Sequence, residues 1–417
     1  MNNGQQSIFQ PVKPTIVFVS NGITPYGTHY LERISAELPE FTLRTIYSYQ
    51  FSMGHWNVKL PSAINAIIFG EGEDVTNLGG LISIRDSFKR YQQIVTEIKT
   101  LSPVAVIILG YGNLAHFLTI KWCHKNSIQC LLSADSNILG DNNTGIKAWI
   151  KSLVVSRVVS CCSAFLSCGN LGTQYFLKYG AHSKQIFLAP VEPDYSLVDN
   201  ISKNIVESVA SEFQLKPDRH RIIYSGRLIA IKRIDLLIDA FIQLAEDRPE
   251  WDLVIAGSGP LEAELKSKVP INLQPRVLWT GFIGAPQNMF ALYRLSEVLA
   301  LTSDYEPWAL VVNEAVSEGL ALVCSDVVGA AAELLRDGEN GRFFVKGDVS
   351  SLETALRDVT DGKNLLRYRA NSAQILHKWR EDADPVAGLR LALEFCFQTS
   401  GVDSLPRQNK SSKSSKK

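Results

Sequence analysis

The chain has 417 residues, of which 46% are hydrophobic and 20% are charged, and its 42 basic residues balance its 42 acidic residues. This length suggests two domains, or at most three, with enough apolar material for two full cores. The zero net charge excludes a global positive field, so we expect no nucleic acid as a partner.

The cysteines, the N-terminal residues and one uncharged stretch bear on the cellular location of the protein. The seven cysteines are odd in number and follow no disulfide or zinc spacing, which favours buried thiols in a reducing environment. Residues 1–14 lack the basic region and apolar run of a signal peptide. Residues 158–177 carry no charge but contain too many Ser, Gly, Asn and Gln residues for a membrane-spanning helix. We therefore expect a cytoplasmic protein without a transmembrane segment.

Short apolar runs alternate with helical patterns along the first half of the chain. The alternation predicts βαβ units and a parallel sheet. The predicted strands cover residues 15–20, 66–69, 104–109 and 130–133, and the predicted helices cover residues 30–38, 91–100 and 114–125.

The same rhythm restarts after a break at residues 189–194 (APVEPD) and a polar helical stretch at 201–214. The predicted strands of the second half cover residues 222–225, 252–256, 277–279, 298–301 and 321–324, and its predicted helices cover 234–244, 261–269, 289–295, 309–318 and 331–335. The sequence therefore predicts an α/β protein of two doubly wound, Rossmann-like domains that face each other across a cleft.

Four segments follow from these patterns. We expect an N-terminal domain at residues 1–195, a C-terminal domain at 196–385, a helix at 386–405 that packs back toward the N-terminal domain, and a disordered basic tail at 406–417. Because open α/β sheets bind ligands at the carboxyl ends of their strands, the site is expected in the cleft between the domains.

Residues 305–319 (YEPWALVVNEAVSEG) carry the most informative pattern. Pro307 is favoured at the first helical position, so a helix is expected to start there, directly after Glu306. The backbone N–H groups of Trp308, Ala309 and Leu310 would then be free to bind an anion or a hydroxyl.

Three further charged side chains belong to the same predicted site. Glu314 is seven residues beyond Pro307, on nearly the same helical face, and a carboxylate suits the vicinal hydroxyls of a sugar or a ribose. Arg227 and Lys232 follow a predicted strand end, where two cations suit a diphosphate and stabilise it as a leaving group.

The glycine-rich loops leave two interpretations open. Residues 257–260 (GSGP) and Gly329 each lie between a strand and a helix. Either they let the backbone approach a ligand, or they form tight turns that serve only the fold.

The order and spacing of these elements over residues 221–345 resemble the donor domain of the family-4 retaining glycosyltransferases, which have the GT-B fold. The matching motifs are a GR…K element with Gly226, Arg227 and Lys232, the GSGP turn, an E-x7-E element with Glu306 and Glu314, and a glycine-turn and acidic segment at 325–341. The sequence departs from the family pattern at Ala309 and Ala330, where relatives carry glycine.

The resemblance implies that a nucleoside diphosphate lies across the C-terminal domain and that a sugar is transferred with retention of anomeric configuration, without a metal or other cofactor. Arg227 and Lys232 would hold the diphosphate, Glu306 the sugar, Glu314 the ribose, and residues 277–282 the base. The predicted donor-binding residues are Gly226, Arg227, Lys232, Gly257, Gly281, Phe282, Glu306, Pro307, Trp308, Ala309, Leu310 and Glu314.

The N-terminal domain supplies weaker candidates. Asp135, at a predicted strand end, would complete a catalytic set with Glu306, Arg227 and Lys232 by positioning the sugar or the acceptor hydroxyl, or it simply caps a turn. Gly22 or Gly27 would approach the diphosphate, and His29 either contacts acceptor or phosphate or faces solvent.

Residues 146–159 (IKAWIKSLVVSRVV) are apolar with interspersed Lys147, Lys151 and Arg157. Such a stretch either lies on an anionic membrane surface at the inner face of the membrane or forms a core helix with a solvated basic edge. The acceptor implied by the resemblance is a glycan, a glycolipid or a small molecule.

Three other functions compete with glycosyl transfer. A GT-B nucleotide-sugar epimerase or hydrolase would need no acceptor, and a non-catalytic relative would bind the nucleotide sugar or a protein partner only. A dinucleotide oxidoreductase would share the doubly wound pattern, but no G-x-G-x-x-G follows the first strand, where NGITPYG stands instead.

Overall fold

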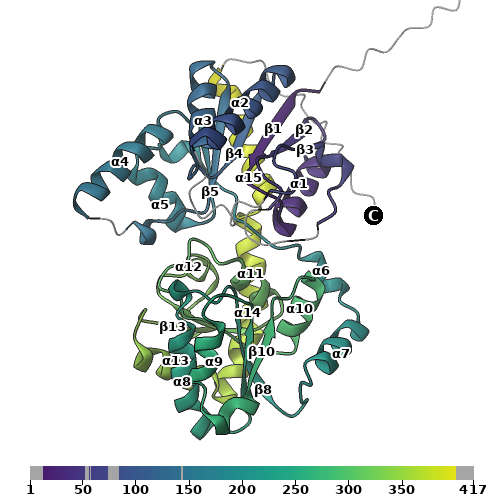
Figure 1. Cartoon of the computed structure of the whole chain (residues 1–417), viewed down its shortest axis with the longest axis vertical. Helices are drawn as coiled ribbons and strands as arrows, with labels where there is room; N and C mark the ends of the chain where they lie inside the picture. Colours follow the sequence, from purple (N-terminus) through teal and green to yellow (C-terminus); the bar gives the residue numbers. More distant parts are fainter. Residues whose placement is uncertain (1–12, 52–55, 57, 74–83, 142–143, 401–417) are drawn as a thin grey trace, which may run out of the picture.

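A computed structural model describes residues 13–51, 56, 58–73, 84–141 and 144–400 of the chain. The predicted tail at 406–417, the end of the predicted helix at 401–405, and parts of the segments 48–60 and 70–90 lie outside the described residues. Two α/β domains lie one above the other along the longest axis of the molecule (Figure 1).

The first domain is built on a seven-stranded sheet with the order β3-β2-β1-β4-β5-β6-β7, in which every neighbouring pair is parallel. Its strands are β1 Thr15–Ser20, β2 Thr42–Tyr47, β3 Ala66–Ile68, β4 Ala105–Leu109, β5 Gln129–Ala134, β6 Ala164–Ser167 and β7 Ile186–Leu188. Its helices are α1 Pro25–Glu37, α2 Ile84–Leu101, α3 Leu114–Lys125, α4 Gly145–Val159 and α5 Asn170–Lys178.

The second domain contains a six-stranded parallel sheet with the order β10-β9-β8-β11-β12-β13. Its strands are β8 His220–Ser225, β9 Trp251–Ala256, β10 Val277–Gly281, β11 Val298–Leu301, β12 Ala321–Ser325 and β13 Gly341–Phe344. Its helices are α6 Ser196–Asn200, α7 Lys203–Glu212, α8 Ile234–Asp247, α9 Glu262–Lys268, α10 Pro286–Arg294, α11 Leu310–Ser317, α12 Ala331–Leu334, α13 Val349–Val359 and α14 Gly362–Asp382.

The central strands match the predictions best. The four inner residues of β1 and all four residues of β11 are buried, as a continuous apolar run requires when helices cover both faces of a parallel sheet. The sequence did not predict β2, β6, β7 or β13. Arg44 interrupts the apolar pattern of β2 and Arg342 that of β13, whereas β7 is apolar but has only three residues.

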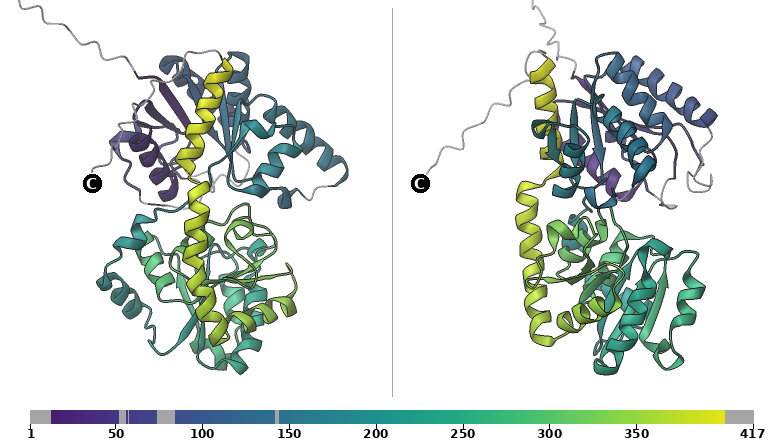
Figure 2. Two further views of the ribbon diagram at one scale, coloured as in Figure 1. Left: turned by 180° about the vertical axis from the view of Figure 1, so that it is seen from behind. Right: turned by 90° about the vertical axis from the view of Figure 1, so that its left-hand side faces the viewer.

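The last two helices join the domains. α14 packs on the second domain against α11 and β12, and α15 (Pro385–Ser400) packs on the first domain against β6, β7 and α1. Figure 2 shows the two helices as one column along the back of the molecule. Leu389, Leu393 and Cys396 of α15 are fully buried in the core of the first domain, so the C-terminal helix completes that core.

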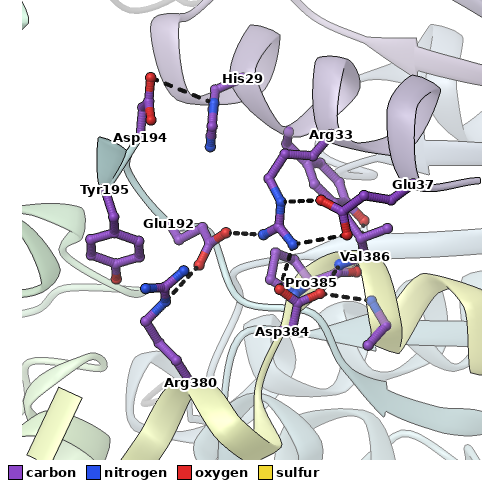
Figure 3. A network of polar contacts seen from close by, with 12 residues as sticks. His29, Arg33, Glu37, Glu192, Asp194, Tyr195, Arg380, Asp384, Pro385 and Val386 are labelled. Atoms are coloured by element: carbon purple, nitrogen blue, oxygen red, sulfur yellow. Dashed lines mark hydrogen bonds and ion pairs between the residues drawn. The ribbon is translucent and has the colours of Figure 1, made fainter. Parts of the chain in front are cut away.

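The chain crosses between the domains twice, at residues 190–195 and at residues 383–385, and one ion cluster ties the crossings together (Figure 3). Arg33 of α1 donates to Glu37 at 2.7 Å, to Asp384 at the second crossing at 2.5 Å, and also to Glu192 at the first crossing. Arg380 lies 3.7 Å from the other oxygen of Glu192. Because the Glu192 side chain is only 5% exposed, these cations compensate a buried charge.

Among the described residues, no helix has both the length and the apolar character needed to cross a membrane. The uncharged stretch at residues 158–177 is divided between the end of α4, strand β6 and most of α5. Its apolar residues are therefore explained by burial in the first domain.

Replacement of Arg33 tests the ion cluster. Arg33→Ala would leave the buried Glu192 with Arg380 alone, and we expect a loss on the order of 3 kcal/mol in unfolding free energy at neutral pH. In calorimetry, Glu192→Gln should cost less in the Arg33→Ala background than in the unmodified protein, because the orphaned charge is removed. Equal costs in both backgrounds would show that the two side chains are not coupled.

Candidate functional site

The most buried charged contact of the second domain joins two residues that are 74 positions apart. The Lys232 ammonium donates to Glu306 Oε1, which also accepts a 2.7 Å bond from the Ser303 hydroxyl. The two side chains are 18% and 8% exposed, so the pair lies at the edge of the interior and keeps some contact with solvent. Lys232 and Glu306 were both predicted from the sequence, and the structure brings them into direct contact.

The loops that carry this pair are tied to each other. Thr302, just after β11, donates its hydroxyl to the carbonyls of Lys232 and Arg233 at 3.0 and 2.9 Å. The Asp304 N–H bonds to the Ile231 carbonyl at 2.8 Å. Because β8 and β11 are neighbours and parallel, the loops that follow them meet at the same edge of the sheet, and these bonds fix their positions.

The start of α11 corrects the sequence prediction. The helix begins at Leu310 and not at Pro307, and residues 302–309 form an irregular loop. Ala309 precedes the helix with φ 79° and ψ 77°, a left-handed conformation that places its Cβ in an unfavourable position. Glycine adopts this conformation without that penalty, which fits the glycine that the family resemblance leads us to expect at this position.

The predicted free donors are nevertheless present. Within the described residues, no acceptor is found for the backbone N–H groups of Trp308, Ala309 and Leu310. The carbonyls of this segment do have partners: Asn137 of the first domain donates its amide to the Glu306 and Pro307 carbonyls at 3.1 and 2.7 Å. The segment is therefore held in place by the first domain and keeps donor capacity for a ligand.

Glu314 lies on α11 beside α10. Its Oε2 accepts a 2.9 Å bond from the Tyr293 hydroxyl of α10. Burial raises the pKa of Glu314 to about 7, and the Tyr293 bond opposes this shift only in part. The residue as a whole is partly exposed, so Glu314 lies at the margin of the core and not at its centre.

Arg227 is exposed to solvent, whereas the glycine turns are closely packed against other loops. The Arg227 side chain is exposed and has no ion pair with any residue that the structure describes. In contrast, a Cβ added to Gly257 would lie 1.9 Å from the Gly226 carbonyl, so packing of one loop against the other already requires glycine there. Gly281 accepts the Gly257 N–H at 2.9 Å and ends β10.

The residues after β10 form a surface hollow lined by Thr280, Phe282, Ile283, Gly284, Ala285 and Asn288, together with Glu212 and Phe213. Phe282 is 52% exposed, and its ring centroid lies 5.0 Å from that of Trp56 of the first domain. The predicted base-lining segment thus faces a hollow and reaches the opposite domain.

The first domain contributes Asp135, which follows β5. The surrounding chain desolvates this carboxyl and raises its pKa, although the side chain retains exposed surface. Together these observations place Asp135 in a concave part of the surface. Asp135 and Asn137 line a small cavity between the domains, which Trp308, Gly329 and Glu333 of the second domain also line.

Two other residues that sequence reasoning did not select lie at this interface. Glu333 accepts bonds of 2.6 and 3.2 Å from the backbone and side-chain amides of Asn170, so it caps the N-terminus of α5 from the opposite domain. Tyr26 at the start of α1 is partly buried. Desolvation raises its pKa, the hydrogen bond with Thr24 lowers it, and the charges of Asp135 and Glu314 raise it further. These residues and their partners lie far apart in the sequence and meet only when the domains are folded. No local sequence pattern could therefore identify them as part of the interface.

The remaining candidate residues of the first domain all contact other residues of the protein. His29 lies 3.7 Å from Asp194 at the first crossing (Figure 3), and burial lowers its pKa. Gly27 donates its N–H to the capping Thr24 hydroxyl at 3.1 Å, and Gly22 is buried with its carbonyl bonded to the Ser20 hydroxyl at 3.2 Å. A ligand role for these three residues stays a prediction.

Comparison with known proteins supports this description. Residues 207–375 match the family model of the glycosyl transferases group 1. The lipopolysaccharide core biosynthesis mannosyltransferase LpsB of Rhizobium meliloti is 31% identical over 157 residues, which are 36% of this chain and 44% of LpsB. The alpha-D-kanosaminyltransferase of Streptomyces kanamyceticus is 29% identical over 157 residues, 37% of this chain and 40% of that enzyme. The matches thus span less than half the length of these relatives.

Solved structures resemble the chain over nearly its whole length. A glycosyltransferase from Rickettsia africae superposes with a TM-score of 0.68 at 14% identity, covering 93% of this chain and 98% of that one. Anabaena HepE in complex with UDP and glucose superposes with a TM-score of 0.64 at 15% identity, covering 93% and 100%. The predicted fold is confirmed: the chain has the α/β GT-B fold, with two Rossmann-like domains.

The conformation of Ala309 generates a stability prediction. Glycine adopts positive φ without the Cβ penalty, so Ala309→Gly should raise the unfolding free energy by about 0.5–1 kcal/mol. The matched control is Ala315→Gly within α11, which should lower it by about 1 kcal/mol or more. Calorimetric Tm values of the unmodified protein and the two variants test both expectations. A destabilised Ala309→Gly variant would contradict the assigned conformation.

Glu314 generates a pH prediction. A pKa raised from 4.5 to about 7 means that the folded state binds the proton more tightly than the unfolded state. This stabilisation is complete below about pH 4.5 and is lost as the pH rises through about 7, for a total of up to about 3 kcal/mol.

Denaturant unfolding from pH 4.5 to 8 tests this sign. Glu314→Gln, which mimics the protonated carboxyl, should match the unmodified protein at low pH and exceed its stability at pH 8. The same substitution at the exposed Glu264 serves as the control. An advantage of Glu314→Gln that does not grow with pH would refute the prediction.

Proposed function

We propose that the protein is a glycosyltransferase that moves a sugar from a nucleoside-diphosphate sugar to an acceptor, with retention of anomeric configuration and without a bound metal. The observation that carries this proposal is the Lys232–Glu306 pair at the carboxyl edge of the second sheet, inside the segment that matches the glycosyl transferases group 1. The relatives and neighbours named above act on sugars or bind UDP, which supports a nucleotide sugar as the donor.

The charges of the site support a division of roles. Lys232 and Arg227 would bind the diphosphate and stabilise the negative charge that develops as it leaves, which removes the need for a metal at this point. Glu306, fixed by Lys232 and Ser303, would orient the donor sugar together with the free N–H groups of residues 308–310. Glu314 would accept the ribose hydroxyls, and the hollow beside Phe282 would take the base.

The reaction we propose breaks the bond between the anomeric carbon and the β-phosphate oxygen and forms a bond from the acceptor oxygen on the same face. The acceptor proton passes to the leaving phosphate oxygen, so no oxidant, reductant or water is consumed. Asp135 lies across the cleft from the second domain and would position the sugar or the acceptor hydroxyl. The Asn137 bonds to the carbonyls of residues 306 and 307 would help to fix the sugar site.

A panel of UDP-, GDP-, ADP- and dTDP-sugars with simple glycoside acceptors tests this proposal. One donor should be consumed in an acceptor-dependent reaction, with the product anomer, assigned by NMR, matching the donor anomer. Lys232→Ala should lower kcat by about 10²- to 10³-fold, because it removes a cation from the leaving group. Glu314→Gln should weaken nucleotide binding, measured calorimetrically, by about tenfold, and the exposed Lys268→Ala serves as the control.

The competing functions give other outcomes. Turnover without an acceptor would point to an epimerase or hydrolase, and binding without turnover would point to a non-catalytic relative. An inverted product would contradict retention, and loss of activity on treatment with EDTA, restored by a divalent metal, would contradict the metal-free mechanism. Equal activity of Lys232→Ala and the unmodified protein would refute the assigned site.

A further inference from the structure

Helix α4 (Gly145–Val159) is apolar on two sides. Its inner side buries Val155, Val158 and Val159 in the core of the first domain. Its outer side presents a stripe at the spacing i, i+3, i+4, i+7, i+8 whose side chains are between 46% and 76% exposed. This stripe, the α4 face, consists of Ile146, Trp149, Ile150, Leu153 and Val154.

The outward position of α4 agrees with this exposure. Figure 1 shows α4 at the outer edge of the first domain, beside α5 and away from the sheet, and the rear view of Figure 2 places the same segment at the edge. A contiguous stripe of five large apolar side chains, including a tryptophan, is more than scattered surface residues account for, and it indicates a partner.

The charge around the α4 face is one-sided. The fifty residues from 142 to 191 contain five lysines or arginines and no Asp or Glu, although the whole chain carries no net charge. Lys147 and Arg157 are exposed near the two ends of the α4 face and have no ion pair with any described residue. Lys151 turns toward the domain, where it pairs with Asp141 at 2.8 Å, so it does not belong to the free basic edge that the sequence suggested.

We propose that the α4 face docks on the surface of a lipid bilayer with anionic headgroups. An exposed apolar stripe with a tryptophan and flanking cations has the composition of helices that lie in the membrane interface, where the apolar side chains enter the acyl boundary and the cations meet the headgroups. A second copy of the chain fits less well, because self-association on this face brings Lys147 and Arg157 of both copies together.

The position of α4 connects this docking to the cleft. Gly140, five residues before α4, packs against the Tyr305 ring of the second domain, and Asn137 bonds to residues 306 and 307. The α4 face therefore belongs to a segment that begins a few residues after groups in direct contact with the proposed sugar site. This step rests on the proposed function and favours an acceptor carried by a lipid.

Vesicle sedimentation at low salt tests the docking without any donor or acceptor. The unmodified protein should sediment with vesicles of phosphatidylglycerol and phosphatidylcholine and remain in the supernatant with phosphatidylcholine alone. Trp149→Ser combined with Ile150→Ser should weaken binding at least tenfold. Lys147→Glu and Arg157→Glu should each weaken it about fivefold and reduce its salt dependence. Ile271→Ser, at an 85% exposed site of the second domain, is the matched control and should bind normally.

Trp149→Phe tests whether the side chain at position 149 itself enters the bilayer. This variant should still sediment, and the difference between its emission spectrum and that of the unmodified protein should show a blue shift for Trp149 on addition of anionic vesicles. Failure of the unmodified protein to bind anionic vesicles would overturn the proposal. So would light scattering that shows a dimer in the unmodified protein and a monomer in the double variant, with no vesicle binding in either. Binding of a nucleotide sugar, measured by calorimetry, should be unchanged in the double variant. A loss of vesicle binding with unchanged nucleotide-sugar binding therefore tests the docking separately from the proposed function.

Discussion

Both sheets are parallel throughout, so each sends the carboxyl ends of all its strands to one edge. The loops with chemical groups must follow the strands there, and the helices occupy the two faces of each sheet. The two crossings of the chain between the domains then decide that these edges face each other. Asp135 after β5 and Pro307 after β11 line one small cavity between the domains for this reason, although no feature of either segment refers to the other.

The Lys232–Glu306 pair illustrates what this arrangement provides. Burying two opposite charges costs desolvation energy, and such a pair by itself is weak support for stability. Here both partners also keep some exposed surface, and the loops that carry them are joined by the bonds of Thr302 and Asp304. The pair is therefore a fixed, charged feature of this sheet edge and not a strong source of folding energy.

Ion pairs and hydrogen bonds hold the two crossing segments to both domains. Arg33, Glu192 and Asp384 connect α1 with both crossing segments, while Trp308 of the second domain donates its indole N–H to the Val191 carbonyl at 2.8 Å. Arg33 lies within α1, which begins at Pro25. The same arginine therefore holds this helix to both crossings.

The class of fold and the candidate charged residues of the second domain can be inferred from the sequence alone. Buried central strands such as β1 and β11 must be continuous apolar runs, and Arg227, Lys232, Glu306 and Glu314 stand in local patterns of fixed spacing. Strands β7 and β13 were not predictable in this way, because β7 has only three residues and β13 contains Gly341 and Arg342.

Only the tertiary structure decided where α11 begins, which glycines serve loop packing, and which residues of the first domain reach the second. Pro307 has the local preference of a helix start, but the bonds of Asn137 hold residues 306 and 307 in a loop, and the helix begins at Leu310. The outward direction of the α4 face was likewise undecided in the sequence, since a buried and an exposed apolar stripe have the same pattern. Tertiary contacts made these choices because each depends on partners that lie far away along the chain.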